Sequence, residues 1–136
     1  MKTNLVAQLQ ARGGLSGVRV TYGPPPDPGR EFICFWGAVG AQSWATYGTT
    51  AGLRAEEYDT ELMIRVLKEG VDDSAADARC FALYGELEQQ LRTDPTVNGA
   101  VQAARIGDFR LEEGIDVDGM NREARLTVQV HCQAFI

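Results

Sequence analysis

Several hallmarks of common protein classes are missing from this sequence. It contains no run of about 18 apolar residues, which excludes a transmembrane helix. Its N-terminus, MKTNLVAQLQARGG, has polar residues where a signal peptide needs an unbroken apolar segment, so we expect a product made in the cytoplasm. Its 13 basic and 19 acidic residues give a net charge of −6, which argues against a surface built to grip nucleic-acid phosphates.

Residues that usually carry catalysis or hold metals are also scarce. The only histidine, His131, lacks the sequence partners that a triad or a zinc site requires, so we expect it at the surface or an interface. Cys34, Cys80 and Cys132 show neither metal spacing nor a disulfide framework, and we expect buried thiols. No glycine-rich segment matches a phosphate loop or a dinucleotide fingerprint. We therefore expect no enzymatic activity, no catalytic or metal-binding residue and no cofactor.

What the sequence does contain is the pattern of one α+β domain spanning residues 1–136. The expected elements are a short helix capped by Thr3, strands at 18–22, 31–39 and 58–66, a helix starting near Ser74, a strand at 97–106 that continues at 109–117, and a last strand at 125–136. This order predicts a mostly antiparallel β-sheet with two helices packed on one face and a long β-hairpin with an extended loop.

The segment RAEEYDTELMIRV, residues 54–66, combines helix-favouring residues with a period of two. From Tyr58 onward its apolar residues fall mainly on one face, whereas Glu57, Asp59 and Glu61 fall on the other. This period fits a strand and would scatter the apolar residues around a helix. We therefore predict a strand that carries three carboxylates at two-residue spacing.

Two other predicted strands differ in whether one or both of their faces are apolar. Residues 31–39, EFICFWGAV, are apolar on both faces, which indicates a strand covered by the helices on one side and by a second subunit on the other. Residues 125–136 alternate regularly, with His131 on the polar face, as expected of a half-buried strand.

The main helix is predicted from one apolar stripe at helical spacing. Its members are Cys80, Leu83, Tyr84, Leu87 and Leu91. Ser74 with Asp77 resembles a capping box at the start of this helix. Asp94-Pro95 is expected to end it.

Between the two strands of the hairpin, residues 40–52 (GAQSWATYGTTAG) read as an uncharged loop with two large aromatic residues, Trp44 and Tyr47. Loops of this length are usually functional, and exposed aromatic residues often mark protein contacts. We expect the loop to reach an adjacent subunit or another protein. The alternative is that the aromatic residues fold back over the edge of the core.

Taken together, the stretches LSGVRVTYGPP, REFICFWG, LRAEEYDTELMIRV, AADARCFALYGELEQQLRTDPTVNG and RLTVQVHCQAFI resemble the tail terminator (tail completion) proteins of long-tailed bacteriophages. The resemblance extends over nearly the whole chain. Its most telling parts are Arg-x-Glu-Glu-Tyr at residues 54–58 and Asp-Pro-Thr-Val-Asn-Gly at residues 94–99. Val97 stands where the family pattern leads us to expect leucine.

This resemblance implies a structural virion protein that forms a six-fold ring at the head-proximal end of the tail. The ring would cap the tail tube, end its polymerisation and join the tail to the head. Its implied partners are copies of itself, the tail tube protein and a connector or neck protein, while DNA passes through the lumen without specific binding. The alternatives are a connector or stopper ring of the neck, and a small enzyme or ligand-binding domain.

For a ring protein, the acidic strand gains two possible roles. The first, which we prefer, places Glu57, Asp59 and Glu61 at a subunit boundary, paired with arginines of this chain or of its neighbour. The second places some of them on the wall of the lumen; an ordinary solvated face is the remaining alternative. The expected interface residues are Trp44, Tyr47, Arg54, Glu57, Asp59, Glu61, Arg105, Arg110 and Arg125.

Overall fold

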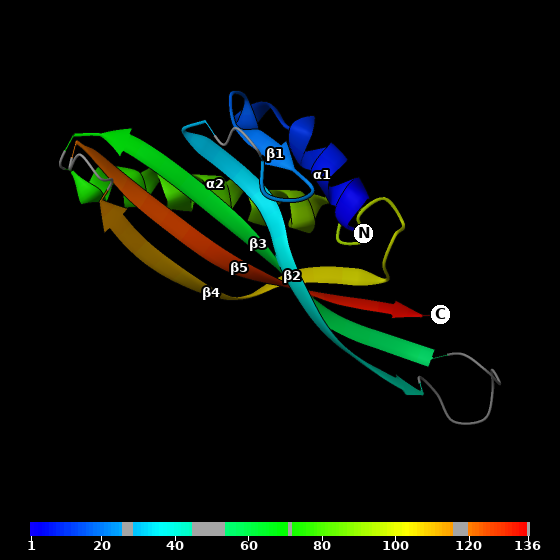
Figure 1. Ribbon diagram of the computed structural model, residues 1–136. Coiled ribbons are helices and arrows are strands. Elements are labelled where there is room, and N and C mark those ends of the chain that lie inside the picture. Colours follow the sequence, from blue (N-terminus) through cyan, green and yellow to red (C-terminus); the bar gives the residue numbers. More distant parts are fainter. Residues whose placement is uncertain (26–28, 45–53, 71, 116–119, 136) are drawn as a thin grey trace.

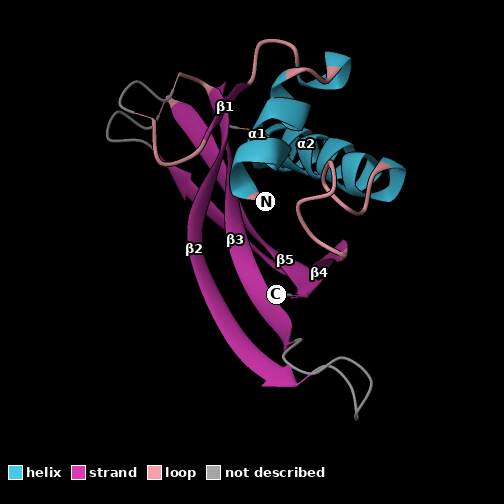
Figure 2. Ribbon diagram, turned by 90° about the vertical axis from the view of Figure 1, so that its right-hand side faces the viewer, coloured by secondary structure: helices cyan, strands magenta, loops and turns pink. Residues whose placement is uncertain are grey.

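The computed structural model describes residues 1–25, 29–44, 54–70, 72–115 and 120–135. In chain order, its elements are α1 (Lys2–Gln10), the 3-10 turn η1 (Gly13–Leu15), β1 (Arg19–Thr21), β2 (Glu31–Trp44), β3 (Arg54–Glu69), α2 (Asp73–Thr93), β4 (Ala103–Ile115) and β5 (Asn121–Phe135). Both α-helices lie on the same face of one sheet (Figure 2). The predicted α+β class and helix-backed sheet are confirmed.

The five strands of the sheet have the order β1-β2-β3-β5-β4. β1 pairs in parallel with β2, and the other three pairings are antiparallel. The long hairpin of β2 and β3 is confirmed, and Figure 1 shows its far end running past both helices. The sheet therefore has a helix-backed part and a part that extends beyond the helices.

The main core lies between the helices and one face of the sheet. Alternate residues of β3 and β5 supply that face, as their period of two predicted. The predicted stripe of α2 packs against it, with Cys80, Leu83, Leu87 and Leu91 buried and Tyr84 partly buried. From α1, Leu5 and Leu9 complete the layer.

A small second cluster lies on the opposite face of the sheet, where Phe32, Cys34 and Met63 are buried together. The guanidinium of Arg65 lies 5.8 Å from the centre of the Phe32 ring. Because Phe32 and Cys34 are already buried within the chain, the predicted cover by a second subunit is not needed there. Trp36, by contrast, is 56% exposed on the same strand.

Both predicted helix caps are wrong. α2 begins after Asp72, whose side chain accepts hydrogen bonds from the backbone N–H groups of Ser74 and Ala75. Asp72 stands at the N-cap, one residue before the first turn, so its carboxylate meets free N–H groups of that turn, and Ser74 lies inside the helix. α1 begins after Met1 without a side-chain cap, and Thr3 lies inside the helix.

Two predicted element boundaries are corrected by hydrogen bonding. Gly40–Trp44 continue β2, because they pair with Arg54–Tyr58 of β3, and only 45–52 of the predicted loop lie outside the described residues. β4 begins at Ala103, and Val97 is not in a strand. The backbone turns there, with positive φ at 97–99, because the Asp94 carboxylate accepts the N–H groups of Thr96 and Asn98.

Candidate subunit interface

The three carboxylates of the acidic strand lie on the face of the sheet that carries no helix. The Asp59 Oδ1 atom is 2.8 Å from His131 Nδ1, and the Glu57 Oε1 atom accepts a 2.9 Å hydrogen bond from Gln133 Nε2. Both partners stand opposite in the β3–β5 register. β3 is an inner strand, so these carboxylates project from the middle of the sheet and not from its edge.

The predicted arginines lie on the two strands beyond β3. Arg110 Nε is 3.0 Å from Glu112 Oε1 and Arg125 Nη2 is 2.8 Å from Glu123 Oε1, so each contacts a glutamate of its own strand. Arg105 stands opposite His131 in the register of β4 and β5. Within the described residues none of the three carboxylates is paired with an arginine of this chain. Their pairing with arginines of a neighbour stays a prediction.

The remaining predicted residues belong to the far end of the hairpin. Trp44 is the last residue of β2 and is paired with Arg54, the first residue of β3. Tyr47 lies outside the described residues. The segment that carries the two expected aromatic contacts therefore starts at the end of the sheet that extends beyond the helices.

His131 lies on the polar face of its strand, as predicted, but its partner Asp59 was not predicted. The contact with Asp59 depends on the register of β3 against β5, which no local pattern reveals. Sequence reasoning also missed three exposed aromatic residues on the helix side of the sheet, Tyr22, Phe81 and Phe109. Phe81 could have been identified from the sequence, because it is a large apolar residue three positions before Tyr84 that lies outside the apolar stripe.

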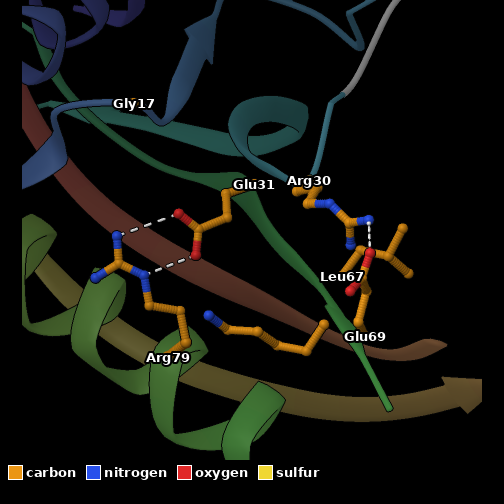
Figure 3. A pocket seen from close by; sticks show the side chains of 7 residues that line it. Gly17, Arg30, Glu31, Leu67, Glu69 and Arg79 are labelled. Carbon is orange, nitrogen blue, oxygen red and sulfur yellow. Dashed lines mark hydrogen bonds and ion pairs between the residues drawn. The ribbon is translucent and has the colours of Figure 1, made fainter.

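The described residues form a charged groove of about 700 Å³. Its lining comprises Gly17, Arg30, Glu31, Leu67, Lys68, Glu69 and Arg79. Figure 3 shows that its charges largely satisfy one another, because Arg79 donates to Glu31 twice, at 2.7 and 3.1 Å, and Arg30 donates to Glu69 at 2.9 Å. The hydrogen bond that Arg79 donates to the Glu31 carboxylate also raises the pKa of Arg79. This groove brings together no nucleophile and base.

The cysteines are buried thiols, as predicted. Burial raises the pKa of Cys80 to about 12 and that of Cys132 to about 11, so both remain protonated and unreactive at neutral pH. Across the described ranges, no three histidine, cysteine or carboxylate side chains are arranged to hold a metal ion. None of the helices there is long and apolar enough to cross a membrane.

Two long strand edges are left unpaired in the described part of the sheet. β4 is the outermost strand on one side and pairs only with β5. On the other side, β1 pairs only with Phe32–Cys34, so β2 has no outer partner strand from Gly37 to Trp44. Unpaired edges present free N–H and C=O groups and invite another strand. The sheet can therefore accept a further strand at two different edges.

No protein-family model and no curated protein matches the chain. Among solved structures it is similar to one chain of a structure described as "Virion of native gene transfer agent (GTA) particle". The TM-score is 0.49 and the identity is 13%, over 98% of this chain and 95% of that chain.

Proposed function

We propose that this chain is a structural protein of a bacteriophage virion, which forms a ring of six copies at the head-proximal end of the tail tube. There it stops polymerisation of the tube and joins the tail to the head, without catalysing a reaction. The observation that carries the proposal is the pair of free strand edges, on β4 and on the far part of β2, at opposite sides of one helix-backed sheet. The resemblance of the sequence to tail terminator proteins supports the same role.

The two free edges occupy the same rows of the sheet. One row runs across the strands through Val39, Asp59, His131 and Arg105. The free part of β2 and the first residues of β4 are therefore at the same height. Successive neighbours from β2 to β4 are antiparallel, so β4 of one copy placed beside β2 of the next continues the antiparallel order. A head-to-tail joint of this kind repeats by rotation and can close into a ring.

The two edges differ in chemistry, and it is the edge of β2 that suits such a joint. Natural edge strands carry charges, prolines or bulges that discourage pairing. β4 has charged residues and an irregularity between Ile106 and Phe109. By contrast, the sequence from Phe32 to Leu53 contains no charge and no proline. The free edge of β2 thus lacks protection against strand addition, as expected of a surface that is covered after assembly.

In this ring, the acidic strand is assigned to the wall of the channel. Because the helices add bulk to one face only, a closed ring curves with the helices outside and the open face inside (Figure 2). Glu57, Asp59 and Glu61 lie on that open face, where negative charge keeps a passing genome from sticking to the wall. The competing proposal is that Arg105, Arg110 and Arg125 of the neighbour pair with them.

The far end of the hairpin is assigned to contacts along the particle axis. It extends beyond the helical layer and leads into the uncharged segment that includes Trp44 and Tyr47 (Figure 1). We assign this segment to an adjacent subunit or to the tail tube protein. Arg54, at the base of the segment, belongs to the same contact.

A connector or stopper ring of the neck is the second candidate, because free edges of this kind serve any ring. The two roles differ in the partner that the ring retains. A tail terminator binds tail tube protein, whereas a connector binds a protein on the portal side. A small ligand-binding domain is the least supported reading, since the charged side chains that line the groove described above form ion pairs with one another.

The test is the mass of the purified protein, measured by light scattering alone and after incubation with tail tubes. The proposal expects a particle of six copies, either free in solution or bound to the tube ends. A monomer or dimer under every condition, with tubes included, would overturn it.

A further inference from the structure

Aromatic side chains form a set at each edge of the sheet on its helix side, and each set includes at least one exposed residue. At the β4 edge, the ring centres of Phe81 and Tyr84 lie 5.8 and 5.6 Å from that of Phe109. Phe81 is 38% exposed and Phe109 is 51% exposed. At the opposite edge, Tyr22 is 58% exposed and its ring centre lies 6.4 Å from that of Phe35. Clustered exposed aromatic residues are typical of protein contacts.

These two sets stand at the two ends of one row of the sheet. Phe35 is aligned with Leu62, Leu62 with Val128, and Val128 with Phe109. β1 ends at Thr21, the residue before Tyr22, so at this row the edge strand no longer covers β2. Tyr22 therefore forms the outer limit of its edge, as Phe109 with Phe81 does at the other.

We infer that Tyr22 of one copy packs against Phe81 and Phe109 of a second copy of this chain. This inference rests on the proposed ring and deepens it by naming the side-chain contact on the outside of its joint. The main-chain joint brings the far part of β2 beside the start of β4. The aromatic contact lies next to it along the same edges, just past the irregularity of β4 between Ile106 and Phe109.

Charges at the same two edges are complementary. A row three residues further along the strands runs from Arg19 on β1 through Phe32, Arg65 and Arg125 to Glu112 on β4. It therefore has a cation at one end and a carboxylate at the other. A head-to-tail joint that brings Tyr22 to Phe109 brings Arg19 toward Glu112, whereas a two-fold joint of like edges would bring identical charges together.

The position of the aromatic sets also favours a second copy over a tube or head protein. Both sets lie at the sides of the sheet, perpendicular to the strands. A partner above or below the ring along the strand direction would instead contact the ends of the hairpin and of the helices. The lateral position fits a neighbour within the same ring.

Cysteine cross-linking tests this contact directly. Tyr22→Cys and Phe109→Cys are made in separate chains, mixed, and exposed to a mild oxidant. The native cysteines are buried and do not compete. A disulfide-linked dimer is expected in the mixture and not in either variant alone, because the contact joins unlike edges. Gln89→Cys, at an exposed position of α2, replaces Phe109→Cys in the control mixture.

The outcomes separate this inference from the proposed ring. A cross-link in the mixture, absent from the control, supports both. Rings in the light-scattering measurement without that cross-link overturn the aromatic contact alone. Linkage of each variant to itself overturns the head-to-tail arrangement. A protein that stays monomeric, with tubes or without, and forms no cross-link contradicts the ring and the contact together.

Shortening the Phe109 side chain provides the second measurement. Phe109→Ala is expected to weaken self-association on the order of 10- to 30-fold, the loss typical of a central aromatic residue in an interface. Ile115→Ala removes another exposed apolar side chain of β4, which is 64% exposed, and should leave association unchanged. A thermal unfolding curve for each variant separates lost association from lost folding. Equal association of the two folded variants would overturn the contact.

Discussion

Asp59 and His131 face each other across two inner strands, with 2.8 Å between Asp59 Oδ1 and His131 Nδ1. The contact lies on the face of the sheet that carries no helix, on the row that ends at Val39 and Arg105. It joins the hairpin to β5. A carboxylate that sequence reasoning assigned to an arginine is thus held within the chain by a histidine.

This pair is expected to stabilise the fold modestly. A double-mutant cycle with Asp59→Asn and His131→Asn should give a coupling free energy of about 0.5–1 kcal/mol, the usual range for partly exposed cross-strand pairs. Urea denaturation of the four proteins measures it. A coupling indistinguishable from zero would mean that the contact contributes nothing to folding.

Reversing the charge of Glu57 and Glu61 together tests the acidic face. Replacing both with lysine should impair ring assembly, because it places cations where the neighbour's arginines, or the charge balance around the channel, require carboxylates. Sedimentation velocity of the folded variant measures the loss. Gln89→Lys, which adds a cation on the exposed side of α2, is the control. Unchanged ring formation by the double variant would refute the pairing of these carboxylates with arginines of the neighbour.

The end of the hairpin is expected to hold the subunit on tails. Trp44→Ala with Tyr47→Ala should release it, by about 30-fold or more in affinity if either residue is a central aromatic anchor. Co-sedimentation with purified tails measures attachment. Trp36→Ala removes an exposed aromatic side chain of the same strand that lies nearer the helices. Full attachment of the double variant would count against this contact.

Acid is expected to loosen the turn that follows α2. The Asp94 carboxylate accepts hydrogen bonds from the Asn98 N–H, the Thr96 hydroxyl and Gln8, and these lower its pKa. A lowered pKa in the folded state stabilises the fold above the ordinary pKa of aspartate, and this contribution disappears as the pH falls through the folded value.

The check is the thermal midpoint of wild-type protein and Asp94→Asn between pH 7 and pH 2. The variant should be less stable at neutral pH, and its deficit should shrink on acidification. Asp72, whose pKa is also lowered by its capping bonds, contributes an acid loss common to both proteins. A deficit that stays constant across this range would contradict the role of the charged carboxylate.

Periodicity was enough to predict which residues of the strands and of α2 face the core. The period of two in β3 and β5 places residues such as Leu62 and Val128 on one face whatever their neighbours are. The apolar stripe of α2, which includes Leu83 and Leu87, follows from helical geometry in the same way. These features depend on the local chain alone.

The errors arose where a residue's role depends on a hydrogen bond that several side chains compete for. Asp72 and Ser74 both suit a helix N-cap, and the backbone geometry selects Asp72. Val97 is β-branched and fits a strand by propensity, yet it adopts a φ of 50°. Its side chain is fully buried, and the bonds to Asp94 hold the surrounding turn.

The candidate interface was predictable only in part. Charge spacing identified the acidic face, but the free edges depend on the order β1-β2-β3-β5-β4 and on the short length of β1. The proposed contact of Tyr22 with Phe109 depends on a row of aligned residues that runs through β2, β3, β5 and β4. Strand order and register arise from contacts between distant segments, which one sequence read locally does not encode.

The most direct test of the central claim is an electron cryomicroscopy image of the particle in which this chain is assembled. We expect a six-fold ring at the head-proximal end of the tail tube, with helices outside and the acidic face of β3 toward the channel. A single copy at another site, or a ring whose subunits leave the edges of β2 and β4 uncovered, would contradict it.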